Sequence, residues 1–81
     1  MSILGLDIGD KRIGVAISSG FDAEPLCVLA RADGRAEREL VRLIQSEKVD
    51  TIVAGLPLDE HGHSTPQCQG VVRFCRRLGR R

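Results

Sequence analysis

The chain has 81 residues and a net charge of +1, with 28% charged residues, no Trp or Tyr and only two Phe. A chain this short buries only about 60% of its unfolded surface and therefore makes one small domain with a thin, mainly aliphatic core. No run reaches the roughly 20 apolar residues of a membrane-spanning helix, and the N-terminus lacks the pattern of a secretory signal. We expect a single cytoplasmic domain over residues 1–81.

The three cysteines, Cys27, Cys68 and Cys75, are an odd number and include no C-x-x-C pair. This pattern predicts neither a disulfide framework nor a zinc knuckle. Because free Cys is among the most buried residue types, all three are expected to behave as small core residues.

Charge is distributed unevenly along the chain. The last nine residues carry five arginines, whereas the first 65 residues hold seven basic and eleven acidic residues. Such a basic end is typical of an anion or nucleic-acid contact. It is equally typical of a solvated helix face, since cations near a helix C-terminus are favourable.

The first stretch predicts a β-hairpin, because two apolar runs flank a polar turn at residues 9–12. Asp7 lies inside the first run, where an unpaired, ionised carboxylate is strongly disfavoured in a core. It should therefore be solvated at a cleft, paired with a cation or bound to a metal. Strand alternation places Gly5 beside Asp7 on one face, with Gly14 and Ala16 on one face of the next strand, leaving a hollow there. The alternative is a hairpin whose Asp7 simply meets water near the strand end.

The next segments predict a third strand and a helix. Residues 18–22 read as a turn, after which Pro25 opens an extended run over residues 26–30. Three sequential strands with short connections indicate an antiparallel meander. Asp33 is expected to cap an amphipathic helix over residues 35–47.

Residues 51–56 form a short continuous apolar run, which is typical of a strand buried on both faces. Because a helix precedes this run, it should join the sheet by a crossover and lie parallel to the first strand. The carboxyl ends of the two strands would then place residues 55–60 beside Asp7. Ligands of open α/β sheets gather at such ends.

A second helix is expected to extend to about residue 78. It begins either at a capping box of Ser64 with Gln67 or at Thr65 with Pro66 in the first turn. Its inner stripe should consist of Cys68, Val71, Val72, Cys75 and Leu78. The layout is therefore β-β-β-α-β-α, an α/β fold whose mixed sheet has three antiparallel strands followed by a parallel one.

Two segments of this layout resemble the YqgF/RuvX family. They are residues 5–16, GLDIGDKRIGVA, and residues 55–58, GLPL, with Gly62 and Gln67 downstream. The resemblance implies the N-terminal portion of a truncated ribonuclease H-like fold, related to RuvC-type Holliday junction resolvases. It also implies a bacterial nuclease that matures the 5′ end of precursor small-subunit ribosomal RNA.

The resemblance assigns Asp7 as a catalytic carboxylate and as a ligand of Mg²⁺ or Mn²⁺. Two divalent ions about 4 Å apart can activate the attacking water and stabilise the leaving oxygen, but holding them takes two or three converging acids. The family pattern continues with an Asp-Glu-Arg-type motif and a late helix bearing an Asp, and neither is present here. Asp10, Asp59 and Glu60 are candidates to replace these acids, although loop acids are usually solvated.

Further site residues follow from the same resemblance. Lys11 and Arg12 are expected to contact a nucleic-acid phosphate next to Asp7. The arginines of the last helix are expected to do the same, namely Arg73, Arg76 and Arg77. The cleft should be lined by Gly5, Gly9, Gly14, Gly55, Leu56 and Pro57.

Three other functions compete with this one. Actin-like ATPases share an Asp-x-Gly hairpin, but they need a second lobe that this chain is too short to form. A Holliday junction resolvase would act on branched DNA in place of precursor RNA. A nucleic-acid-binding or self-associating module without turnover is the non-catalytic alternative, because an open sheet edge tends to pair with another chain.

Overall fold

The computed structural model describes residues 2–79. Two of the five C-terminal arginines, Arg80 and Arg81, therefore lie outside the described residues, as does Met1. The elements follow the predicted β-β-β-α-β-α order. They are β1 (Ile3–Ile8), β2 (Arg12–Ser18), β3 (Ala23–Ala30), the short 3₁₀ helix η1 (Ala32–Gly34), α1 (Arg35–Ser46), β4 (Thr51–Ala54) and α2 (Pro66–Gly79).

The four strands form one mixed sheet in the order β3-β2-β1-β4. β2 pairs antiparallel with both β1 and β3, and β4 pairs parallel with β1. The predicted meander and the predicted parallel crossover strand are therefore both confirmed. β1 lies between a hairpin partner and a crossover partner, so segments distant in sequence meet at its carboxyl end.

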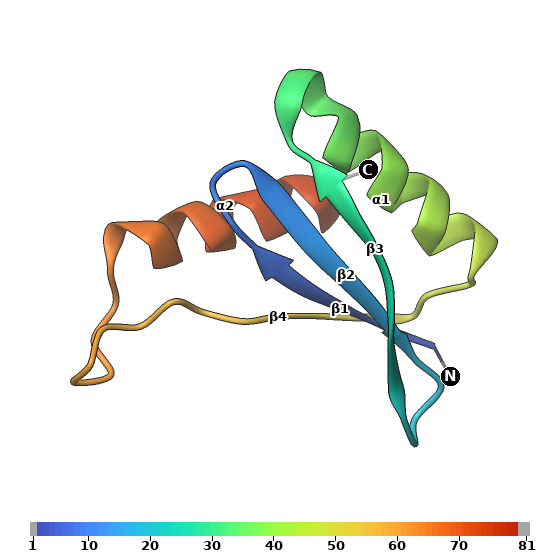
Figure 1. The fold of residues 1–81 in the computed structure, drawn as a ribbon, viewed down its shortest axis with the longest axis horizontal. Coiled ribbons are helices and arrows are strands. Elements are labelled where there is room, and N and C mark those ends of the chain that lie inside the picture. The colour runs from blue at the N-terminus through green and yellow to red at the C-terminus, as the bar shows by residue number, and fades with distance from the viewer. Residues whose placement is uncertain (1, 80–81) are drawn as a thin grey trace.

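Both helices cover the same face of this sheet. Leu4 and Leu6 of β1 and Ile13 and Val15 of β2 are buried, and they share one hydrophobic cluster with residues of α1 and α2. The helical members of that cluster are Ala36, Leu40, Phe74 and Leu78. In Figure 1, α2 passes behind the β1–β2 hairpin. Because Leu4 and Leu6 face the helices, strand alternation places Gly5 and Asp7 on the opposite face.

The third strand begins earlier than predicted. Pro25 lies inside β3, two residues after its start at Ala23. The pairing register shifts between Val15 and Ala16, which leaves Leu26 as an extra residue. Proline is tolerated at this position because β3 is an edge strand with a bulge, where a ladder hydrogen bond is not required of every residue.

Asp33 does not cap α1. Its own backbone adopts a positive φ of 59° within η1, and Gly34, at φ 69°, occupies the cap position without a side-chain hydrogen bond. Aspartate is one of the few residues that tolerates this left-handed conformation. The residue therefore serves the turn that leads into the helix and not the first turn of the helix itself.

The fourth strand is not buried on both faces, contrary to the expectation from its apolar sequence. Ile52 is 36% exposed and Val53 is 56% exposed. β4 lies at the edge of the sheet, and the helices cover only one face. A continuous apolar run cannot by itself distinguish a central strand from such an edge strand.

The second helix begins as the Thr65 alternative predicted. The Thr65 hydroxyl accepts a hydrogen bond from the Cys68 backbone N–H at 3.3 Å, and Pro66 is the first helical residue. The inner stripe differs from the prediction, because Phe74 is fully buried while Val72 is 38% exposed. A rotation of α2 about its axis that buries the Phe74 ring removes more apolar surface from water than a rotation that buries Val72. Among residues 2–79 no helix is long and apolar enough to cross a membrane.

Candidate functional site

Asp7 lies near the carboxyl end of β1, on the sheet face that the helices leave open. It is exposed and is paired with Gly14 of β2. A Cβ at Gly14 would lie 3.6 Å from the Asp7 Cβ, and one at Gly5 would lie 3.9 Å from the Ala16 Cβ. The missing side chains leave open a hollow of about 520 Å³ that Asp7 lines, so the structure places the small residues beside the carboxylate as the alternation predicted.

The Asp7 carboxylate faces solvent. Within residues 2–79, none of the side-chain hydrogen bonds or ion pairs involves it. Asp7 could be solvated at a cleft, paired with a cation or bound to a metal. Among the described residues it is solvated and has no cation partner. A solvated carboxylate beside empty space is free to bind a ligand without first breaking an ion pair.

The fourth strand brings a second segment to this hollow. Leu6 of β1 pairs with Ala54 of β4, and the Gly55 N–H donates to the Leu6 carbonyl at 3.2 Å. Gly55 and Val53 both line the hollow with Asp7. The parallel pairing thus places the start of the 55–60 segment at the same level of the sheet as the carboxylate.

The six expected cleft residues are divided among three hollows. Gly5, Gly14 and Gly55 lie with Asp7. Gly9 and Pro57 line a separate hollow of about 330 Å³ between the β1–β2 turn and the start of α2. The path of the chain after Gly55 explains this division, because it leaves the open face and crosses toward the helices.

Leu56 lies in the third hollow, which follows the outer side of α2. Arg73 and Arg76 line the same hollow as Leu56 and Leu58. Both leucines are about half exposed, at 52% and 50%. The α2 arginines therefore border an apolar strip and do not line the Asp7 hollow.

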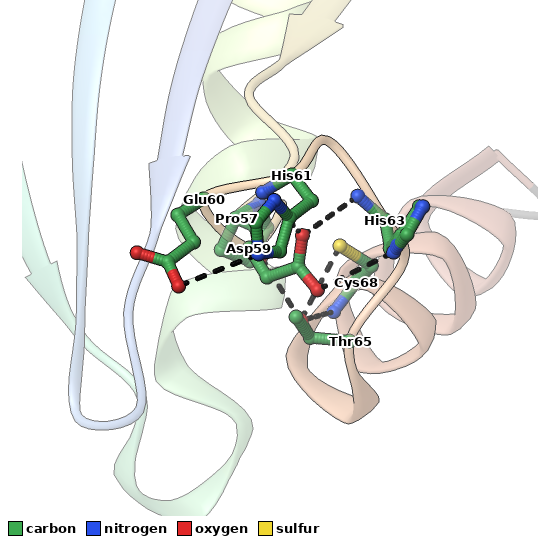
Figure 2. Close-up of polar contacts among 7 residues, drawn as sticks. All are labelled: Pro57, Asp59, Glu60, His61, His63, Thr65 and Cys68. Atoms are coloured by element: carbon green, nitrogen blue, oxygen red, sulfur yellow. Dashed lines mark hydrogen bonds and ion pairs between the residues drawn. The ribbon is translucent and has the colours of Figure 1, made fainter.

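Asp59, one of the candidate replacement acids, is occupied within its own loop. Its Oδ1 accepts the His61 and His63 backbone N–H groups at 2.9 and 2.8 Å (Figure 2). Its Oδ2 lies 3.9 Å from His63 Nδ1, and Glu60 lies 3.6 Å from His61 Nε2. These contacts build a compact turn, closed by Gly62 at a φ of 78°, so the Asp59 carboxylate is engaged within its own loop.

The described residues do not fit a divalent-ion site on their own. They contain no group of three or more His, Cys, Asp or Glu side chains that could hold an ion. A two-ion centre needs two or three converging carboxylates, and Asp7 is the single acid that lines its hollow. The acids at Asp10 and Glu60 are exposed loop residues, so any ion at Asp7 requires further ligands.

Thr65 connects this loop to the helix that follows. Its hydroxyl donates to the Pro57 carbonyl at 2.9 Å and also lies 3.4 Å from Cys68 Sγ (Figure 2). The Thr65 hydroxyl, followed by the Thr65 backbone, lowers the pKa of the Cys68 thiol, whereas burial raises the pKa of Cys75. All three cysteines are free, and Cys68 is the one that is fully buried.

The basic residues occupy two separate regions. Lys11 and Arg12 are exposed on the β1–β2 turn, close in sequence to Asp7. On α2, the Arg77 guanidinium carbon lies 5.7 Å from the centre of the Phe74 ring. α2 covers the sheet face opposite to Asp7, whereas Lys11 and Arg12 belong to the turn that directly follows β1, the strand of Asp7.

One residue of the site escaped the sequence analysis. Arg31, directly after β3, donates from Nη1 to the Gly9 carbonyl at 2.7 Å, and its guanidinium carbon lies 5.2 Å from the Phe74 ring centre. In the sequence, the one sign of this role was a basic residue directly after the third strand, which pairs with the second strand of the hairpin. That signal becomes specific only once the register of β2 and β3 is known.

Comparison with known proteins identifies relatives along the full chain. The family model described as "RuvX: Holliday junction resolvase" matches residues 1–81. A Clostridium botulinum protein named "Putative pre-16S rRNA nuclease" is 42% identical over 78 residues, which cover 93% of this chain and 57% of the relative. A Thermoanaerobacter pseudethanolicus protein of the same name is 43% identical, covering 96% of this chain and 58% of its own length. The chain thus spans less than two thirds of these relatives.

The Thr65 contacts predict the behaviour of the neighbouring thiol. Thr65→Val removes the hydroxyl that lowers the pKa of Cys68, so the pKa should rise, whereas Thr65→Ser keeps the hydroxyl and should leave it near that of the parent chain. The pH dependence of the Cys68 Cβ chemical shift measures the midpoint without requiring access to a buried thiol. Equal midpoints for the two variants would show that the hydroxyl does not act on Cys68.

Proposed function

Since the chain belongs to the RuvX Holliday junction resolvase family, we propose that it supplies the first carboxylate and a phosphate-binding turn of a nuclease. The proposed substrate is precursor 16S ribosomal RNA, in keeping with the names of the relatives, and trimming at its 5′ end is our own proposal. The mixed four-stranded sheet is compatible with a truncated ribonuclease H-like fold. The observation that carries the proposal is the solvated Asp7 in an open hollow where β1 and the segment after β4 meet.

The chemistry requires that a water molecule attack a phosphodiester while negative charge on the phosphate is stabilised. Mg²⁺ or Mn²⁺ is our proposed cofactor; Asp7 would be one ligand, and the ion would supply such stabilisation. Because the described residues bring only this one acid to the hollow, we propose that water and phosphate oxygens of the substrate supply the further ligands. Asp7 itself lies at the surface, where an extended phosphate backbone can approach it.

The turn cations provide the complementary charge. Lys11 and Arg12 are exposed on the same hairpin as Asp7, and they can neutralise phosphates on either side of the bond to be cleaved. Phosphate contacts fix the position of the substrate but do not read its sequence. The chain contains two Phe and no Trp or Tyr. Phe74 is fully buried, and Phe21, which is 96% exposed, lies in the β2–β3 turn at the end of the sheet opposite Asp7, so base stacking beside Asp7 is not part of the proposal.

A non-catalytic module is the second candidate, and a specific observation favours it. One carboxylate is too few to hold a pair of divalent ions, and the exposed residues of β4 and of the loop after it leave an edge that can pair with a second chain. In this alternative the chain binds structured RNA or branched DNA, or associates with itself, without turnover.

A cleavage assay tests the first candidate. The chain is incubated with the 5′ leader region of precursor 16S ribosomal RNA at millimolar Mg²⁺ or Mn²⁺, because a single carboxylate holds a divalent ion weakly. We expect cleavage that depends on the metal ion and falls at least about 100-fold in Asp7→Asn. Asp22→Asn makes the same chemical change at the opposite end of the sheet and should cleave like the parent chain.

The outcomes of this assay separate the candidates. Equal cleavage by the parent chain and Asp7→Asn would remove Asp7 from the reacting centre. Binding without any cleavage would favour the module. A four-way DNA junction in parallel shows whether branched DNA is preferred over the RNA.

The salt dependence of RNA binding tests the phosphate-binding turn. Lys11→Gln and Arg12→Gln should each reduce the slope of log Kobs against log salt by about 0.7–0.9, because each cation releases about one counterion. Arg42→Gln is the matched control, since Arg42 is paired with Glu39 at 2.7 Å on α1. Arg73→Gln, Arg76→Gln and Arg77→Gln measure the separate contribution of α2. Slopes for Lys11→Gln and Arg12→Gln equal to that of Arg42→Gln would contradict the assignment.

Light scattering after size-exclusion chromatography tests self-association. We expect the chain to form a dimer or larger species through β4, whose Val53 is 56% exposed. Val53→Lys places a charge on this edge strand and should shift the population toward monomer, while Ser19→Lys in a remote turn should not. A stable parent monomer at every concentration would exclude pairing through β4.

A further inference from the structure

Arg31 contacts the β1–β2 turn through both its backbone and its side chain. Its backbone N–H donates to the Lys11 carbonyl at 3.0 Å, and its Nη1 donates to the Gly9 carbonyl at 2.7 Å. The turn is closed by a hydrogen bond from the Gly9 N–H to the Arg12 carbonyl at 2.9 Å. A single residue at the end of β3 thus binds two carbonyls of the four-residue turn.

The turn itself is tight at Gly9. A Cβ at this position would lie 3.0 Å from the Arg12 carbonyl oxygen. The close approach leaves the turn without a Gly9 side chain that could pack against the rest of the protein. Gly9 itself therefore does not fix the turn against the helices, and Arg31 contacts the turn from outside it.

The guanidinium of Arg31 provides that connection. Its central carbon lies 5.2 Å from the centre of the Phe74 ring, and Phe74 is fully buried in the hydrophobic core. Within residues 2–79 the ion pairs include no partner for Arg31. The side chain is held by an aromatic ring on one element and a carbonyl on another, so it joins the turn to α2.

We propose that Arg31 is a positioning residue that fixes the β1–β2 turn against α2, so that Lys11 and Arg12 are held beside Asp7 for a phosphate backbone. This inference rests on the proposed function for its nucleic-acid part. Arg31 acts through the turn and does not itself touch the reacting phosphate. Arg31 also lines the hollow between the turn and α2.

The geometry requires arginine in particular. A planar guanidinium can stack on a ring and donate to a carbonyl in its own plane at the same time. The ammonium of lysine is a strongly hydrated point charge on a flexible stem and cannot reproduce both contacts. The conservative change Arg31→Lys therefore separates positioning from charge, because it keeps the cation and loses the geometry.

Amide hydrogen exchange of the 81-residue chain tests the positioning step without RNA. Arg31→Gln and Arg31→Lys should each accelerate exchange of the Gly9 amide by about tenfold, the effect of losing a hydrogen bond from a charged donor. Amides at the centre of β1 and β2 should stay protected, which shows that the sheet is intact. Arg77→Gln is the matched control, since Arg77 also lies over the Phe74 ring, at 5.7 Å, but makes no hydrogen bond to the turn.

The result that overturns the proposal is specific. If Arg31→Gln leaves Gly9 exchange within twofold of the parent chain, Arg31 does not hold the turn. The same conclusion follows if Arg31→Lys restores the exchange rate of the parent, or if Arg77→Gln accelerates exchange as much as Arg31→Gln.

RNA affinity provides the second measurement. Arg31→Lys should weaken binding of the 5′ leader RNA as much as Arg31→Gln does, by about tenfold, although it keeps the charge. Parent-like affinity of Arg31→Lys would show that Arg31 acts by charge alone and would overturn the positioning role. A parent chain that binds no RNA would overturn the proposed function, while the exchange measurement still decides whether Arg31 holds the turn.

Discussion

The pairing of β1 on both of its edges is the constraint on which the rest of the structure depends. Its antiparallel partner places Gly14 opposite Asp7, and its parallel partner brings Gly55 to the same level of the sheet. One face of β1 is filled by Leu4 and Leu6 under the helices. Strand alternation then directs Asp7 to the other face, where no described element covers it. A shift of one residue in either pairing would bury the carboxylate and expose the leucines.

The loop after β4 shows how local hydrogen bonding restricts chemistry. Asp59 is close in sequence to the site, but its carboxylate accepts two backbone N–H groups of its own turn. Such turns are a frequent use of aspartate, because its short side chain satisfies backbone donors that have no other partner. Within residues 2–79, none of the side-chain hydrogen bonds involves the Asp7 carboxylate. The difference between the two acids therefore comes from their surroundings and not from their side chains.

The family assignment and the geometry support different parts of the proposal. The relatives are named as ribosomal RNA nucleases, but this chain spans less than two thirds of their length. The geometry adds a solvated carboxylate, a hollow lined by small residues and a turn held by Arg31 over Phe74. In the proposed function, these features form one side of a phosphate-binding surface. They leave the number of acids below what a two-ion centre requires.

The sequence by itself determined the order of elements, the hairpin, the parallel fourth strand and the face on which Asp7 lies, because these follow from hydrophobic periodicity and turn residues that act locally. Only the tertiary structure decided that Phe74 and not Val72 enters the core, that β4 is an exposed edge, and that Gly9 and Pro57 lie apart from Asp7. It also decided the contacts of Arg31, whose carbonyl partner is 22 residues away. Such contacts depend on strand register and on the rotation of a helix, which are set by the packing of the whole core.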